Sequence, residues 1–226
     1  MILREKPRRL KSGFARSLNI MDFVKDCDEI IQRLNQQGWA VSDSVISRDW
    51  QEGLLAQSQT LWAAKGFQAG EIGHGDKGRE QPEIRGDWIH WVEPGSPPAA
   101  HPFFGWMARF RDVLNTKFPL GLRSQEFHFA RYAEGKGYQK HIDQHRGTDH
   151  RKVSIVLYLN PQWGPSDGGE LCLYQPYQPE VEMSRIAPLG ARLVVFVSGM
   201  IPHAVLPCKR TRWSIAGWLR TDDGRS

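Results

Sequence analysis

Two histidines, one aspartate and one arginine have the residue types and spacing of a metal site that also binds an anion. His141 and Asp143 form a His-x-Asp pair, and His203 and Arg212 lie far downstream. Two neutral nitrogens and one anionic oxygen on one face of an ion leave the opposite positions open for a co-substrate and dioxygen, which suits non-haem Fe(II). A guanidinium can hold a carboxylate through two hydrogen bonds, so Arg212 is a candidate anion-binding residue. Tyr158 is a candidate second donor, although a role as a core tyrosine is about equally favoured.

The chain contains a second His-x-Asp pair, His74 and Asp76, so the motif alone is not specific. This second pair lies in a polar, glycine-rich run at 71–82, which is typical of a loop without fixed side-chain directions. His141 and Asp143 instead follow a Gly-x-Gly turn in a short extended segment, where residues i and i+2 point to the same face. We therefore predict that His141 and Asp143, and not His74 and Asp76, supply metal ligands.

Composition predicts one principal domain without a membrane segment. The chain has 226 residues, of which 40% are hydrophobic, enough for a sizeable core over residues 19–226. The three cysteines form no CxxC pair, which fits a reducing compartment. There is no apolar run of 18 residues, and residues 1–16 lack the apolar part of a signal peptide, so we expect a cytoplasmic protein.

The net charge of +5 comes from the first residues. Residues 1–16 contain six basic residues and one acidic residue, which leaves 24 of each sign in the remainder. This basic tail, residues 1–18, could contact nucleic acid, but a solvated and disordered end is the favoured interpretation.

Periodicity predicts helices first and then a series of short strands. We expect helices from 19 or 22 to Gly38, from Asp49 to about Lys65, and from Pro102 to Lys117, with strands at 39–45 and 83–92. Eight strands then follow without helices between them, at 126–132, 138–143, 152–159, 170–174, 181–186, 192–197, 203–206 and 213–219. This order predicts a mostly β fold, a jelly roll, with the helices packed on one sheet.

Several segments resemble one known family. They are LNQQGWAV at 34–41, IRGDWIHW at 84–91, GYQKHID at 137–143, YLNPQW at 158–163, GGELCL at 168–173 and RWSIAGW at 212–218. The chain resembles the Fe(II)- and 2-oxoglutarate-dependent dioxygenases with a double-stranded β-helix. Within these it is similar to a bacterial member of the prolyl hydroxylases related to the oxygen-sensing enzymes that act on hypoxia-inducible factor.

The resemblance implies a role for each matched residue. The metal ligands would be His141, Asp143 and His203. The residues around 2-oxoglutarate would be Arg212, Tyr158, Tyr132 and Trp218. The residues that order or contact a protein substrate would be Arg85, Asp87, Arg151 and Trp91. The implied reaction is 4-hydroxylation of a prolyl residue, with succinate and CO2 as products and ascorbate as a supporting cofactor. Bacterial relatives suggest elongation factor Tu as the protein substrate.

Two departures from the family pattern and three alternatives accompany this interpretation. Ala216 stands where the animal enzymes carry a threonine, and the turn after Tyr132 is one residue shorter. A zinc hydrolase using His141 and His145 is disfavoured, because Ile142 stands where its motif needs a glutamate. A nucleic-acid demethylase of the same fold is disfavoured, because its usual second arginine pattern after the distal histidine is absent from this sequence and no groove with aromatic and basic residues is evident. A non-catalytic, cupin-like sensing module would not require Arg212.

Overall fold

The computed structural model describes residues 20–72, 79–144 and 148–223. The predicted basic tail at 1–18 and the pair His74 and Asp76 lie outside these residues. In chain order the elements are α1 (Ile20–Gln37), β1 (Trp39–Ser42), α2 (Arg48–Ala63), β2 (Gln68–Ala69), β3 (Glu71–Ile72), β4 (Arg79–Glu80), β5 (Asp87–Trp91), the 3-10 helix η2 (Pro97–Ala100), α3 (Pro102–Lys117), β6 (Ser124–Tyr132), β7 (Tyr138–His141), β8 (Arg151–Tyr158), β9 (Leu171–Tyr174), β10 (Glu182–Ile186), β11 (Leu193–Val197), β12 (His203–Val205) and β13 (Arg212–Arg220).

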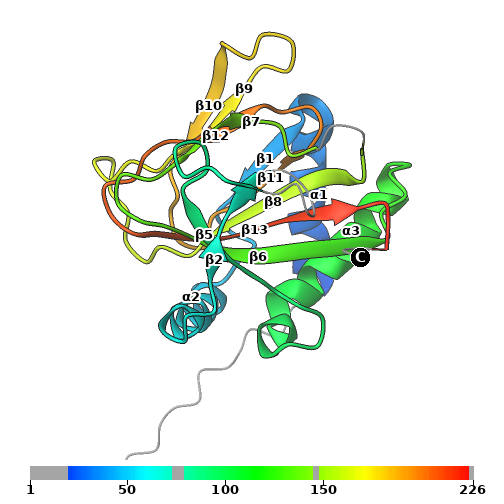
Figure 1. The fold of residues 1–226 in the computed structure, drawn as a ribbon. Coiled ribbons are helices and arrows are strands. Elements are labelled where there is room, and N and C mark those ends of the chain that lie inside the picture. The colour runs from blue at the N-terminus through cyan, green and yellow to red at the C-terminus, as the bar shows by residue number, and fades with distance from the viewer. Residues whose placement is uncertain (1–19, 73–78, 145–147, 224–226) are drawn as a thin grey trace, which may run out of the picture.

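The strands form two facing sheets, as the jelly-roll prediction expected. The larger sheet has the order β1-β11-β8-β13-β6-β5-β2 and the smaller one the order β10-β9-β12-β7, while β3 and β4 pair separately. Every pairing between neighbouring strands is antiparallel. Figure 1 shows the smaller sheet on one side of the larger sheet, with α1 and α3 on the other. None of the helices in the described part of the chain is long and apolar enough to cross a membrane.

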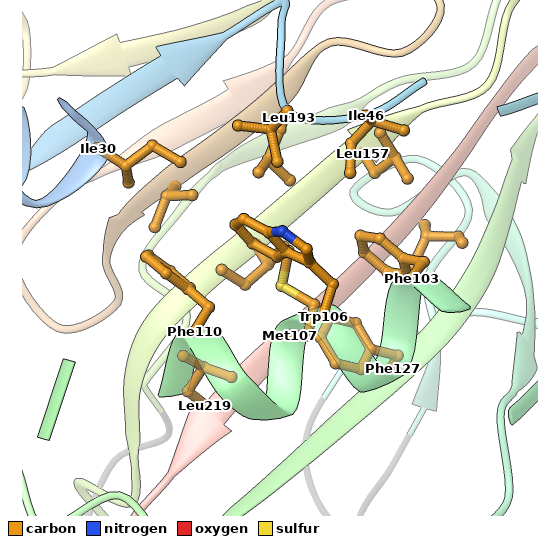
Figure 2. Close-up of a cluster of buried hydrophobic side chains, with 14 of the residues drawn as sticks. Ile30, Ile46, Phe103, Trp106, Met107, Phe110, Phe127, Leu157, Leu193 and Leu219 are labelled. Atoms are coloured by element: carbon orange, nitrogen blue, oxygen red, sulfur yellow. The ribbon is translucent and has the colours of Figure 1, made fainter. Parts of the chain in front are cut away.

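Alternation along the strands of the larger sheet produces two separate cores. On β11, Leu193 and Val195 belong to the core beneath the helices, whereas Val194 and Phe196 belong to the core between the sheets. In the helix-side core, Trp106 of α3 is fully buried, and side chains from α1, β8, β11 and β13 surround it (Figure 2). Full burial of a large apolar side chain contributes about 1.5–3 kcal/mol, so this layer holds α1 and α3 against the sheet.

The predicted elements are correct in kind, but several boundaries were wrong. The helix α2 begins at Arg48 and not at Asp49, because the hydroxyl of Ser47 accepts from Trp50 N–H at 3.2 Å and caps it. It ends at Ala63, before Lys65, whose φ of 58° is not helical. The strand predicted at 39–45 ends at Ser42.

The strand predicted at 83–92 also shortens, to Asp87–Trp91. Its first part is a turn in which Gly86 N–H donates to Gly137 O at 3.0 Å. A single bridge links Arg85 to Tyr138, so this turn still contacts β7. The three cysteines are free and buried.

Two glycines offer a matched test of this packing. A Cβ on Gly217 would collide with the ring of Phe127 and with the carbonyl of Glu126, whereas a Cβ on Gly105 of α3 would meet nothing within 4 Å. We expect Gly217→Ala to lower the free energy of unfolding by about 1–3 kcal/mol through overpacking. Gly105→Ala should raise it by roughly 0.5–1 kcal/mol, because alanine favours the helix. Urea unfolding followed by tryptophan fluorescence measures both changes, and equal midpoints would contradict the packing described here.

Candidate metal centre and its cavity

The predicted ligands His141, Asp143 and His203 converge in the structure. Their candidate ligand atoms all lie within 4.8 Å of one another. Asp143 Oδ1 is 3.5 Å from His141 Nε2 and 3.6 Å from His203 Nε2. His203 is the first residue of β12 and pairs directly with His141, the last residue of β7. Asp143 lies two residues beyond the end of β7, so the predicted strand to 143 was too long, although the ligands still meet.

The backbone sets the tautomer and the direction of each imidazole. His141 Nδ1 lies 2.7 Å from Gln139 O, and His203 Nδ1 lies 3.1 Å from Ile201 O. A carbonyl oxygen can only accept, so each Nδ1 carries the proton and each Nε2 presents a lone pair toward Asp143. Histidine ligands are commonly oriented by such a bond from the other nitrogen. Both rings are therefore prepared to coordinate a metal ion through Nε2.

Asp143 is oriented by a serine pair and by the two imidazoles. Its Oδ2 accepts from Ser154 Oγ at 2.7 Å, and Ser154 Oγ lies 2.8 Å from Ser198 Oγ. Burial on its own would raise the pKa of Asp143, but His203 and His141 hold that pKa well below its usual value. Burial lowers the pKa of His203, yet the carboxylate of Asp143 outweighs it and raises that pKa. The pKa of His141 is lowered by burial and by His203. The cluster thus favours an ionised carboxylate beside at least one neutral imidazole.

A cavity of about 700 Å³ opens from this cluster and contains Arg212 in its lining. The guanidinium is only 2% exposed; its Nε donates to Gly169 O at 3.0 Å and its Nη1 to Ser214 Oγ at 3.3 Å. It forms no ion pair with any carboxylate in residues 20–72, 79–144 and 148–223. A buried charge without a counter-charge is costly, so this end of the cavity suits an anion.

The other residues predicted around the co-substrate surround this guanidinium or line the same cavity. The rings of Tyr132 and Tyr158 each have their centroid 5.0 Å from the guanidinium carbon. Tyr158 is fully buried, and its hydroxyl has no hydrogen bond of normal geometry within the described residues. Burial raises the pKa of Tyr158, so its hydroxyl stays protonated and can donate. Trp218 lines the cavity farther along β13.

The four residues predicted for substrate contact line the same cavity, and three of them are charged and already paired. Arg85 holds Asp87 through two hydrogen bonds of 2.7 and 3.2 Å, and Asp87 is 3% exposed. Arg151 donates to Glu126 at 2.9 Å and lies 3.5 Å from the ring centroid of Trp218. Trp91 forms part of the wall beside it. The paired charges therefore shape the cavity without adding net charge to it.

Among the cavity residues that sequence reasoning missed is His128 on β6. It is 2% exposed, and its ring centroid lies 4.8 Å from that of Trp91 and 5.6 Å from that of Trp218. Burial, followed by the charge of Arg85, lowers its pKa to about 3, so the ring is neutral. The signal was present: alternation along β6 puts His128 on the same face as Tyr132, which was predicted.

The zinc-hydrolase alternative fails on local structure. Its motif requires two histidines on one helix, but His141 ends the strand β7. His145 lies outside the described residues. The ligand set is therefore a strand-based cluster with one carboxylate, which fits Fe(II) with open positions better than a helical zinc site.

Known proteins resemble this chain in sequence and fold. Residues 127–220 match the model of the 2OG-Fe(II) oxygenase superfamily. A crystal structure of a Pseudomonas putida prolyl-4-hydroxylase is 35% identical with a TM-score of 0.77, over 87% of this chain and 99% of that one. A prolyl hydroxylase from Trichoplax adhaerens, in complex with a hypoxia inducible factor oxygen degradation domain peptide fragment, has the same TM-score at 24% identity, over 92% of this chain and 94% of that one.

A hypoxia-inducible factor prolyl hydroxylase of Caenorhabditis elegans is 27% identical over 216 residues, 84% of this chain, and the chain spans about 28% of the length of that protein. The fold and the His-Asp-His cluster thus define a double-stranded β-helix oxygenase that uses Fe(II) and 2-oxoglutarate. Within this class the chain belongs to the prolyl 4-hydroxylase family.

The serine that orients Asp143 offers a test of the site. Ser154→Ala removes the hydroxyl that donates to Asp143, so we expect the affinity for Mn(II), a redox-stable substitute for Fe(II), to fall by roughly 10- to 100-fold. Ser184→Ala, on β10 and outside the cavity lining, is the matched control. Anaerobic titration calorimetry gives both affinities. The assignment of Asp143 as an oriented ligand is wrong if the two variants bind Mn(II) equally well.

Proposed function

We propose that this chain is a prolyl 4-hydroxylase in which His141, Asp143 and His203 hold Fe(II) and Arg212 binds 2-oxoglutarate. The observation that carries the proposal is the buried, unpaired guanidinium in the same cavity as three converging ligands. A metal site alone would fit many functions. A co-substrate that chelates the metal at one end and has a free carboxylate at the other requires an anion site near the metal site.

The co-substrate would lie between the metal cluster and the far end of the cavity. Arg212 would hold its distal carboxylate, and Tyr158 would donate a hydrogen bond to the same group. Tyr132 would pack beside the guanidinium, and Trp218 would close the wall. The guanidinium is fixed by its bonds to Gly169 and Ser214, so the anion is oriented without reorganisation of the protein.

In the proposed reaction, one atom of O2 enters the C4–H bond of a prolyl residue. The other enters 2-oxoglutarate, which leaves as succinate and CO2. Fe(II), when bound, supplies the dioxygen chemistry. The protein's own residues orient the two substrates and exclude water, for which the rings of Trp91, His128 and Trp218 provide an aromatic wall.

The proposed substrate is a protein, with elongation factor Tu as the candidate that the family resemblance suggests. Trp91 and Arg151 line the cavity wall that a prolyl side chain would meet. The ion pair of Arg85 and Asp87 would order this wall. A cytoplasmic location, a role for the tail at 1–18 and a single domain over 19–226 stay predictions.

The decisive experiment combines the proposed ligands with the second His-x-Asp pair as a control. With Fe(II), 2-oxoglutarate, O2 and purified elongation factor Tu, we expect the wild-type chain to add one oxygen to a prolyl residue, detected by mass spectrometry. His141→Ala and Asp143→Ala should abolish the turnover of 2-oxoglutarate because each removes one of three ligands.

His74→Ala should leave this turnover intact. Equal losses in all three variants would refute the ligand assignment. Turnover of 2-oxoglutarate by the wild type without any change in elongation factor Tu would instead reject only the protein substrate.

Arg212 can be tested separately from the metal. Arg212→Ala removes the proposed partner of a buried carboxylate, a loss worth about 2–5 kcal/mol. We therefore expect the Kd of 2-oxoglutarate, measured anaerobically with Fe(II), to rise by roughly 30-fold or more. Fe(II) should still bind, because Arg212 is not one of its proposed ligands. Arg185→Ala, an exposed arginine on β10, is the control. Unchanged affinity in Arg212→Ala would place the anion elsewhere.

A further inference from the structure

The cavity wall opposite the metal cluster contains three polar atoms without partners. Nδ1 of His128, Nε1 of Trp218 and Oε2 of Glu126 are all buried, and none of them hydrogen bonds within the described residues. All three residues line the cavity. The other oxygen of Glu126 accepts from both Arg151 and Arg220, so only Oε2 is free. Buried polar atoms normally have partners, so three orphans in one wall indicate a ligand that supplies them.

These three atoms lie close together because of the sheet register. Glu126 is opposite Trp218 in the pairing of β6 with β13, and His128 follows Glu126 by two residues on the same face. The rings of His128 and Trp218 are 5.6 Å apart between centroids. The three residues form one polar subsite, which we call the β6/β13 subsite.

The β6/β13 subsite lies apart from the place proposed for 2-oxoglutarate. Ser154 of β8 orients Asp143, so the metal cluster lies over β8, and the strand order from there is β8, β13, β6, β5. His128 on β6 is two strand spacings away, about 10 Å. Ser154 is in one row with Trp218 and Glu126, and His128 is in the neighbouring row with Ala216 and Val156. The anion site at Arg212 is four residues along β13 from this row.

The chemistry of the subsite matches a peptide group. The indole nitrogen of Trp218 can only donate, the carboxylate of Glu126 can only accept, and a neutral imidazole offers one donor and one acceptor. A peptide group likewise offers one carbonyl acceptor and one N–H donor. The charges of Arg151 and Arg220 are paired with Glu126, so nothing in the subsite favours a second anion.

We propose that His128, with Trp218 and Glu126, binds the main-chain peptide group that follows the target prolyl residue. This inference rests on the proposed function, because it places a polypeptide in the cavity. The carbonyl of that peptide group accepts from the imidazole or the indole, and the N–H of the next residue donates to Glu126. His128 is then a substrate-binding residue that contacts the main chain of the substrate, and this contact does not depend on the side chains around the prolyl residue.

The test uses a small probe so that it does not depend on the identity of the protein substrate. N-acetyl-L-proline N-methylamide contains the peptide group after proline, and N-acetylpyrrolidine lacks it. Both are titrated anaerobically by calorimetry into the chain loaded with Fe(II) and 2-oxoglutarate. His128→Phe keeps the aromatic wall and removes both nitrogens, whereas His128→Asn and His128→Gln keep a neutral polar group near Nδ1 or Nε2. Thermal unfolding checks that each variant is folded.

We expect His128→Phe to weaken the binding of N-acetyl-L-proline N-methylamide by tenfold or more, and Asn or Gln to recover most of this loss. N-acetylpyrrolidine should bind the wild type and His128→Phe equally. The loss of affinity for the first probe should exceed any loss for 2-oxoglutarate by at least fivefold. If His128→Phe fails to fold, the same comparison is made between His128→Asn, His128→Gln and the wild type, and a difference of tenfold or more between Asn and Gln supports the proposal.

Several outcomes overturn it. If all variants bind N-acetyl-L-proline N-methylamide equally well, bound water or packing accounts for the three polar atoms without partners. A larger loss for 2-oxoglutarate than for the probe means that His128 serves the co-substrate. No binding of the probe to the wild type also rejects the subsite. Failure of the proposed function has a different signature, because the wild type would then not turn over 2-oxoglutarate with Fe(II).

Discussion

The pairing of β12 with β7 is the constraint on which the candidate site depends. His141 and His203 are 62 positions apart, and only their direct opposition across this strand pair brings two imidazoles to one point. A slip of one residue would turn His203 to the other face of the sheet. The pairing also contains a bulge, with Gln139 and Lys140 on β7 opposite Ala204 alone. Bulges redirect side chains beside active sites, and this one lies directly before His141.

Two opposite charges, on the largely buried Asp143 and the buried Arg212, define the electrostatics of the cavity. The carboxylate of Asp143 is stabilised by two imidazoles and by Ser154, while the guanidinium of Arg212 has a carbonyl, a hydroxyl and two aromatic faces. Neutral partners of this kind reduce the cost of burying a cation but do not cancel its charge. The cavity thus has a cation-binding end and an anion-binding end, which come from different sheets: the two histidines lie on β7 and β12 of the smaller sheet, and Arg212 lies on β13 of the larger sheet.

The helices contribute rigidity and not chemistry. Each strand of the larger sheet presents alternate residues to the helix-side core and to the cavity, so Phe127 and Phe129 anchor the strand whose other face carries His128 and Tyr132. A site built on strands that are packed on both faces is held more firmly than one built on loops. The fully buried Trp106 is therefore part of what keeps the cavity wall in register (Figure 2).

The sequence by itself determined the local features of this protein. The periods of 3.6 and 2 predicted the helices and strands, and the His-x-Asp context after a Gly-x-Gly turn selected His141 and Asp143. The resemblance to a family supplied Tyr132, Trp218, Arg85 and Arg151. Errors fell at element ends, because one hydrogen bond accepted by Ser47 or one bridge at Arg85 decides where an element begins or ends.

Only the tertiary structure decided which side chains share a cavity and which of them lack partners. Glu126 looks like an ordinary surface charge in the sequence, yet it is paired with Arg151 and lines the cavity. His128 looks like a core histidine, and only the strand register shows that it faces the same space as the metal cluster. Whether a buried polar atom has a hydrogen-bond partner depends on contacts between residues far apart in the chain, and no local sequence pattern contains that information.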